Sequence, residues 1–207
     1  MGGPHKVGIV VVSYNAPTAV RVTLASVRAA RNDVAHELVL VDNASRPDDR
    51  EEIRRALHRH VQEAGLPWRH LQSDKNLGFS GGNNVGIRAL LEDPAITHLC
   101  LLNSDVIVPH RWLDQLLASG LDVVSPVTNK AMSEQCVPID YTFELADCLD
   151  PAGERLRDDV FATIDAFAVR RHRVFGGHRV DCDATFFCVL LSRAAVERIG
   201  LLDETFF

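Results

Sequence analysis

The chain has 207 residues, of which 46% are hydrophobic and 24% are charged, and its formal net charge is -6. This composition is typical of a globular protein with a substantial core, and it excludes an intrinsically disordered chain. The negative balance gives no basic patch for nucleic acid, so we expect no nucleic-acid partner. Any bound anion must be held locally, by a cation, by backbone amides or by a few Arg and Lys side chains.

The cysteines and the first residues indicate a cytoplasmic protein. Five cysteines without a CxxC pair favour reduced thiols over a disulfide framework or a zinc site; they are Cys100, Cys136, Cys148, Cys182 and Cys188. The apolar run near the amino end is too short for a signal sequence or a membrane span. We expect a soluble chain and leave open a peripheral contact with a membrane.

The first 126 residues alternate between strands and helices. Apolar, β-branched runs predict strands at residues 7–13, 37–42, 68–73, 98–103 and 122–126. Helical spacing of apolar residues predicts helices that start at Pro17 and after a Ser45–Asp48 capping box, and others within residues 80–93 and 109–119. This alternation predicts a mostly parallel α/β sheet covered by helices.

The rhythm stops after Pro126. Residues 127–160 are polar and irregular, residues 174–193 suggest a further strand or hairpin, and residues 194–200 suggest a short helix. Phe186 and Phe187 are predicted to fill core rather than to shape a binding site. With no repeat and no clear linker, we expect one domain over residues 1–207, with a first half at 1–126 and a second at 127–207.

Polar side chains follow each of the first four predicted strands. They are Ser13, Tyr14 and Asn15; Asp42, Asn43 and Ser45; Ser73, Asp74 and Asn76; and Asn103, Ser104 and Asp105. One such group is explained by the preference of turns for Asn, Asp and Ser. Four groups at the edge where parallel sheets bind ligands predict a site instead.

The turn after the first strand narrows the choice of ligand. It reads "SYNAP" and has no glycine, which argues against a dinucleotide fold, and no lysine-containing phosphate loop follows it. A diphosphate would therefore need another partner. Mg²⁺ or Mn²⁺ requires only one or two protein carboxylates when phosphate oxygens complete its shell, and Asp105 is the best candidate for that ligand.

Four segments in this order resemble the inverting glycosyltransferase family 2 with a GT-A fold. They are "VVVSYN", "LVLVDNAS", "NLGFSGGNNVGI" and "LLNSDV", and they resemble the rhamnosyltransferase-like branch most. The resemblance covers residues 7–126 and resumes at "ATFFCVLLSR" and "IGLLDETFF". It implies a nucleotide-sugar-binding first half and an acceptor-side second half.

The resemblance also implies roles for single residues. The residues expected to bind the nucleotide-sugar are Ser13, Tyr14, Asn15, Asp42, Asn76, Gly78, Asn83, Asn103 and Ser104. Gly81 and Gly82 are expected to let the backbone approach the ligand. Asn103-Ser104-Asp105 resembles the family's Asp-x-Asp metal motif with Asn at its first position, so Asp105 is expected to hold the metal and Asn103 to bind ribose or a metal-bound water.

The base of the reaction is not identified within the sequence. Family members of this branch carry it in an acidic pair after the "DE-FF" stretch, so we expect it beyond Phe207, with Asp183, Asp203 and Glu204 as weaker candidates. The implied reaction is transfer of a sugar from a UDP-, TDP- or GDP-linked donor to a hydroxyl acceptor such as a glycan, a lipid-linked sugar or a natural product. The alternative is a nucleotide-sugar-binding module without catalysis, or a catalytically incomplete glycosyltransferase fragment whose acceptor-side half at 127–207 continues beyond Phe207. A nucleotidyltransferase is disfavoured by "SYNAP".

Overall fold

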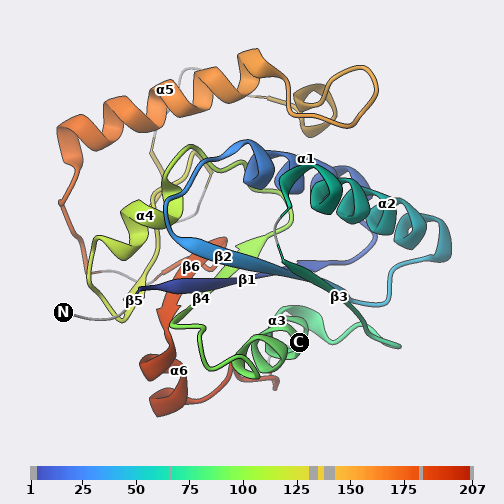
Figure 1. Cartoon of the computed structure of the whole chain (residues 1–207), viewed down its shortest axis with the longest axis horizontal. Coiled ribbons are helices and arrows are strands. Elements are labelled where there is room, and N and C mark those ends of the chain that lie inside the picture. Colours follow the sequence, from blue (N-terminus) through green and yellow to red (C-terminus); the bar gives the residue numbers. More distant parts are fainter. Residues whose placement is uncertain (1–3, 66, 131–134, 138–142, 182–183, 206–207) are drawn as a thin grey trace.

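The computed structural model describes residues 4–65, 67–130, 135–137, 143–181 and 184–205. It has a central sheet with helices on both faces and a further helix above one of these helical layers (Figure 1). The strands are β1 (Lys6–Ser13), β2 (Ala35–Asp42), β3 (Trp68–Gln72), β4 (His98–Asn103), β5 (Val123–Val124) and β6 (Cys188–Ser192). The helices are α1 (Pro17–Ala29), α2 (Pro47–Ala64), α3 (Gly78–Leu91), α4 (Trp112–Leu117), the short η1 (Leu145–Cys148), α5 (Asp158–Phe175) and α6 (Arg193–Ile199).

The sheet has the order β3-β2-β1-β4-β6-β5. Strands β1 to β4 run parallel to one another, whereas β6 is antiparallel to both β4 and β5. Ser13 lies beside Asp42, Asp42 beside Gln72, and Val12 beside Asn103, so the four parallel strands end at one edge. The predicted mostly parallel α/β sheet is confirmed, and the strand expected within 174–193 is β6.

Each face of the sheet has its own core. Residues of β1, β2 and β4 alternate between the faces because successive side chains of a strand point in opposite directions. On one face, Ile9, Leu40 and Leu102 pack with α1, α2 and α4; on the other, Val10 and Val41 pack with α3 and α6. Phe187 packs against the first core and Phe186 against the second, which confirms their predicted core positions.

Glycines bring α3 close to β1. A Cβ atom on Gly82 would lie 2.7 Å from Cγ1 of Val12, and one on Gly86 would lie 2.4 Å from Cγ1 of Val10. On Gly81, the added Cβ would meet the Cβ of Leu77 at 2.7 Å. Close contacts within the protein thus explain the missing side chains of Gly81 and Gly82, and the expected approach of their backbone to a ligand stays a prediction.

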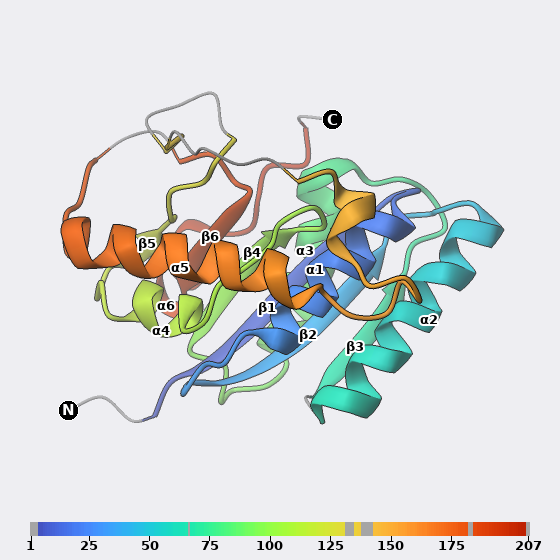
Figure 2. The ribbon, with the colours of Figure 1, turned by 90° about the horizontal axis from the view of Figure 1, so that it is seen from above.

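Helix α5 forms an outer layer that the sequence analysis missed. It starts at Asp158, within the segment read as irregular, and runs for 18 residues across α1 and α4 (Figure 2). Val160 and Ile164 pack with Val22 and Ala25, which lie on the side of α1 away from the sheet. The signal was present in the i, i+4 spacing of Val160 and Ile164 and in the acidic first turn, Asp158 and Asp159.

Two further expectations concern cysteines and membrane spans. Cys100, Cys136, Cys148 and Cys188 carry free thiols, and Cys182 lies outside the described residues. Within the part of the chain that the structure describes, no helix is both long and apolar enough to cross a membrane.

Candidate functional site

A cleft of about 490 Å³ opens at the carboxyl edge of the parallel strands. Eight of the polar or glycine residues singled out in the sequence line it, namely Tyr14, Asn43, Asn76, Gly78, Asn83, Asn103, Ser104 and Asp105. The remaining wall is apolar and comes from Val12, Ala16, Ala19, Phe79, Leu102 and Leu145. The structure therefore brings the ends of β1, β2 and β4 and the start of α3 together around one concave space.

The end of β4 supplies three polar side chains to the cleft. Asn103, Ser104 and Asp105 follow one another at the cleft, and Asp105 is exposed. Among the described residues, none accepts or donates a hydrogen bond to any of these three side chains. They present an amide, a hydroxyl and a carboxylate to whatever enters the cleft.

Two buried side chains of α1 hold the segment after Asp105 in place. The Val106 N–H donates to the Thr23 hydroxyl at 3.1 Å, and the Val108 N–H donates to the Ser26 hydroxyl at 3.2 Å. Thr23 and Ser26 are fully buried. Sequence reasoning missed this pair, although polar residues beside the apolar stripe of a helix are a usable signal.

Asp42, at the end of β2, lies behind the cleft instead of in it. Its side chain is 0% exposed, and both of its oxygens have partners within the chain. One oxygen accepts from the Ser45 N–H at 2.9 Å and the other from Nε of Arg50 at 3.0 Å. The contacts that the structure gives Asp42 fix the β2–α2 turn, and direct contact with a nucleoside stays a prediction.

Asn15 and Ser45 join the turns that follow β1 and β2. The Ser45 hydroxyl accepts from the Asn15 N–H at 2.9 Å, and the Asn15 side chain accepts from the Arg46 N–H at 2.8 Å. Asn15 has a φ of 51°, a left-handed conformation that asparagine tolerates. The predicted Ser45 capping box is wrong, because α2 begins at Pro47 and Asn15 takes the hydroxyl.

Asn43 connects the end of β2 with the start of α3. Its amide nitrogen donates to Oδ1 of Asn76 at 2.9 Å and to the Gly78 carbonyl at 3.0 Å, and its oxygen accepts from the Leu77 N–H at 3.0 Å. Gly78 has a φ of 68°, which a glycine adopts without strain. Asn83 donates to the Phe79 carbonyl at 2.9 Å. These bonds shape the wall of the cleft.

Ser13, like Asn15 and Asp42, is a predicted nucleotide-binding residue that does not line the cleft. Val12 lines the cleft, and the next side chain of the strand points to the opposite face of the sheet. The Ser13 hydroxyl is buried there without a hydrogen-bond partner among the described residues. Val12 and Tyr14 line the cleft on either side of it, and contact between Ser13 and a nucleotide stays a prediction.

Two exposed aromatic rings border the cleft. Tyr14 is 49% exposed and Phe79 is 44% exposed, although both side chains are largely apolar. The Phe79 ring meets the Phe186 ring edge-on, with their centroids 6.4 Å apart. Phe79 was not singled out in the sequence; its place between Gly78 and the buried glycines of α3 is what brings it to the rim.

The acidic residues near the end of the chain are engaged elsewhere. Glu204 accepts from the Asn84 amide at 2.7 Å and from Arg88 at 3.2 Å, and these bonds lower the pKa of its carboxyl. Bonds from the N–H and hydroxyl of Thr205 lower the pKa of Asp203. Asp183 lies outside the described residues. Neither Asp203 nor Glu204 lines the cleft.

The chemistry of the cleft fits a divalent cation that a ligand helps to hold. Across the described ranges, no group of three or more His, Cys, Asp or Glu side chains forms a complete metal site. Asp105 is the carboxylate of the cleft lining, and it has no partner there. One carboxylate is sufficient for Mg²⁺ or Mn²⁺ only where ligand oxygens and water provide the other positions. The residues present fit that arrangement.

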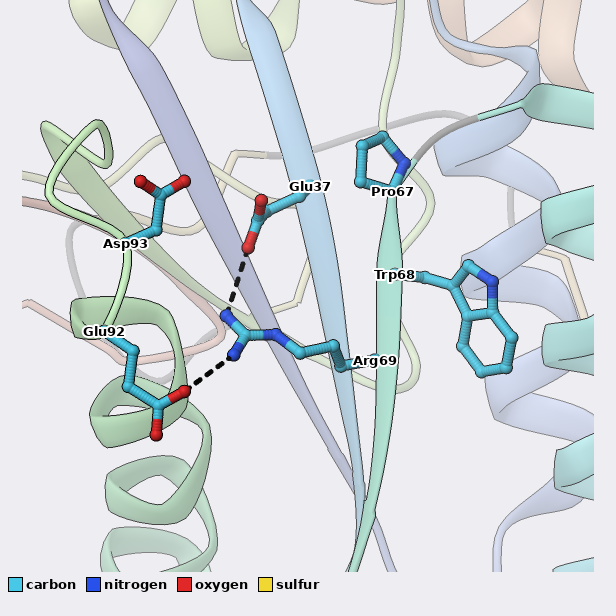
Figure 3. Close-up of a pocket in the computed structure, with 6 residues that line it drawn as sticks. All are labelled: Glu37, Pro67, Trp68, Arg69, Glu92 and Asp93. Carbon is cyan, nitrogen blue, oxygen red and sulfur yellow. Dashed lines mark hydrogen bonds and ion pairs between the residues drawn. The ribbon is translucent and has the colours of Figure 1, made fainter.

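A second pocket, of about 390 Å³, lies toward the opposite ends of the strands (Figure 3). Arg69 bridges Glu37 and Glu92 there, and Lys6 bridges Glu37 and Asp93. The bonds that Lys6 donates to Asp93 and Glu37 raise the pKa of Lys6. Because these charges pair with one another, we interpret the pocket as an ion-pair network that links β1, β2 and β3 to the end of α3.

Comparisons with known proteins agree with this architecture. Residues 8–121 match Glycosyl transferase family 2. The low-salt glycan biosynthesis hexosyltransferase Agl10 of Haloferax volcanii is 25% identical over 175 residues, covering 83% of this chain and 49% of that protein. The mannosyltransferase PcManGT of Pyrobaculum calidifontis, solved with GDP-Man and Mn²⁺, superimposes with a TM-score of 0.59 at 17% identity, covering 98% of this chain and 48% of that one. The chain thus spans about half the length of each.

Proposed function

Because the chain belongs to glycosyltransferase family 2, we propose that it binds a nucleotide-diphospho-sugar and transfers the sugar, with inversion, to a hydroxyl acceptor in a metal-dependent reaction. We place it in the rhamnosyltransferase-like branch on the four segments of residues 7–126. The GT-A fold supports the proposal, since the PcManGT likeness extends over nearly the whole chain.

One observation carries the proposal. The side chains of Asn103, Ser104 and Asp105 lie together at the cleft and make no hydrogen bond to the described part of the chain. Polar side chains at the carboxyl edge of a parallel sheet usually bind ligands. Here they remain available for a ligand, because they form no hydrogen bonds with other groups of the described protein. A nucleoside diphosphate offers hydroxyls to the amide and serine, while its phosphates attract a cation held by Asp105.

The chain's residues have separable roles in the proposed reaction. Tyr14 offers a ring to the base, and Asn103 and Ser104 orient the donor. Asp105 would hold the divalent cation, which when bound supplies charge neutralisation for the departing diphosphate. Asn43 and Asn76 keep the opposite wall in position through the bonds described above. Holding the donor in one orientation lowers the barrier to transfer, because the donor has already lost its translational and rotational freedom before the reaction begins.

A specific observation favours a second candidate function. An inverting transfer needs a base for the acceptor hydroxyl, and Asp105 is the only carboxylate among the described residues that line the cleft. If Asp105 holds the metal, it cannot also serve as that base. The alternative is a module that binds the nucleotide-sugar without transferring it.

Titration calorimetry tests donor binding. GDP-mannose, UDP- and TDP-sugars are titrated with Mn²⁺, with Mg²⁺ and with EDTA. Asp105→Asn should keep the free energy of unfolding of the parent and lose at least about tenfold in metal-dependent affinity, as expected when a charged partner is removed. Asp74→Asn is the matched control, since Asp74 is exposed in the neighbouring loop but does not line the cleft. Equal donor affinity in the Asp105→Asn protein would exclude the metal role.

Turnover distinguishes the two candidate functions. Release of nucleoside diphosphate is followed with glycan, lipid-linked and small-molecule hydroxyl acceptors, for this chain and for the product of its complete reading frame. Acceptor-dependent release by either protein supports the transferase. Tight donor binding without acceptor-dependent release by both supports the binding module.

A further inference from the structure

The carboxyl end of α5 and the residues after it form an exposed segment, residues 169–180. Every residue from His172 to Asp181 is exposed to solvent. In Figure 1, this end of α5 extends to the edge of the molecule beyond α4. The amino end of α5, in contrast, packs on α1 through Val160 and Ile164. The helix therefore extends beyond the surface that anchors it.

The exposed segment is strongly basic within an acidic chain. Between Asp165 and Asp181 the sequence has four arginines and two histidines and no acidic residue. In the described structure, no carboxylate pairs with Arg170, Arg171 or Arg173. The Arg171 guanidinium lies 4.1 Å from the centre of the Phe175 ring. The net charge predicted no basic patch. The arginines of residues 170–179 correct that inference, because they form a local basic patch.

The same segment exposes apolar side chains. Val174, Phe175 and Val180 are 65%, 43% and 74% exposed, and Val169 is exposed as well. Val160, Ile164 and Val174 lie on one stripe of the helix, because they are spaced by four and ten residues. The stripe that packs α5 on α1 therefore continues, uncovered, to the last turn.

We propose that residues 169–180 dock the protein on an anionic lipid surface. Arginines beside exposed apolar side chains match both layers of such a surface, since the guanidinium groups meet anionic headgroups and the apolar groups enter the headgroup boundary. A nucleic acid would satisfy the arginines but would offer nothing to the valines. The segment contains none of the residues that line the cleft, so docking leaves the cleft accessible.

Vesicle flotation with the full chain tests the proposal. Vesicles of phosphatidylcholine alone are compared with vesicles that also contain phosphatidylglycerol. Each arginine near an anionic surface strengthens binding about fivefold, so Arg170→Gln/Arg173→Gln should weaken it about twenty-five-fold. Val174→Ser/Phe175→Ser should weaken it by at least about tenfold. Arg54→Gln/Arg55→Gln on α2 removes the same charge from another exposed surface and should leave binding unchanged.

The outcomes separate the alternatives. Binding that requires phosphatidylglycerol, weakens with salt and depends on both variant pairs supports lipid docking. Binding that survives Val174→Ser/Phe175→Ser and is competed equally by RNA would identify a general polyanion surface and overturn the proposal. Failure to float with any vesicle would overturn it as well, and a concentration-dependent dimer in sedimentation would then assign the segment to a second copy. Circular dichroism verifies that each variant is folded.

Discussion

The ends of β2 and β4 carry the same kinds of side chain but use them differently. After β2, Asp42 and Asn43 are buried, and their polar atoms bind Arg50, Ser45 and the start of α3. After β4, the side chains of Asn103, Ser104 and Asp105 have no hydrogen-bond partner in the described chain. The residues after β2 thus form the frame of the cleft, which we define as the bonds of Asp42 and Asn43, whereas the residues after β4 face the space where a ligand would bind. Changes in the frame should lower stability first, and changes at β4 should lower ligand binding first.

The largest effect is expected at the frame, for Asp42→Ala. The substitution removes the acceptor of the Ser45 N–H and leaves the partly buried Arg50 without its carboxylate. Breaking one side of such a pair should lower the free energy of unfolding by about 3 kcal/mol. Urea unfolding followed by fluorescence measures it, with the exposed Asp48→Ala as control. A change no larger than that of the control would mean that Asp42 is free to contact a ligand, and the comparison between strand ends would fail.

A smaller effect on stability is expected for Thr23→Val. The two side chains have the same shape, so the variant removes only the acceptor of the Val106 N–H. We expect a loss of about 1 kcal/mol in the free energy of unfolding. Because Val106 follows Asp105, Mn²⁺-dependent donor affinity should fall as well, which calorimetry measures.

Thr163→Val on α5 is the control for this prediction. It removes a threonine hydroxyl that bonds a helix carbonyl far from β4, the Asp159 carbonyl. Donor affinity should stay at the parent value in the Thr163→Val protein. An equal loss of affinity in both variants would show that Thr23 has no particular role in positioning Asp105.

The smallest effect concerns Glu204, which links α3 to the end of the chain. Bonds from Asn84 and then Arg88 lower the pKa of Glu204 in the folded protein. The stability that these bonds give is present above the pKa of a free glutamate, about 4.3, and is lost as the pH falls through the lower folded value. The parent should therefore unfold at a higher temperature than Glu204→Gln at neutral pH, and the difference between the two unfolding temperatures should shrink in acid.

Arg88→Gln sharpens this last prediction. It keeps the Asn84 bond and removes the weaker ion pair, so part of the pH dependence should persist. If the difference in unfolding temperature between the parent and Glu204→Gln grows in acid, the predicted direction of the pH dependence is wrong.

Much of the fold could be predicted from the sequence. Strands β1, β2 and β4 are continuous apolar runs, and their burial on both faces requires covering helices. The short β5 lies within the predicted strand at residues 122–126, whereas α5 was missed because it starts in a segment that is polar and irregular in sequence. Helix α5 forms where Val160 and Ile164 meet a face of α1 that no local pattern reveals.

The candidate site could be predicted as a place, but not residue by residue. The ends of the strands indicated the edge at which Tyr14 and Asp105 now line a cleft. Whether a polar side chain there is free depends on partners distant in sequence: Asn43 is bound by residues 33 to 35 positions away. The residue preferences of a single turn cannot provide that information. For this reason the sequence predicted ligand contacts for both Asp42 and Asp105, each of which lies at a strand end.

The reversal of β6 has a consequence for the order in which the protein folds. Strands β1 to β4 are joined by short helical connections and can pair as soon as they are synthesised. The partner of β4 on its other side is residues 188–192, roughly ninety positions later; Cys100, for example, pairs with Leu190. Until that segment emerges, β4 is an open edge with an apolar sequence, the kind of surface that recruits foreign strands. A ribosome that pauses before Cys188 would therefore prolong the stage at which the nascent chain is most exposed to aggregation and most dependent on chaperones.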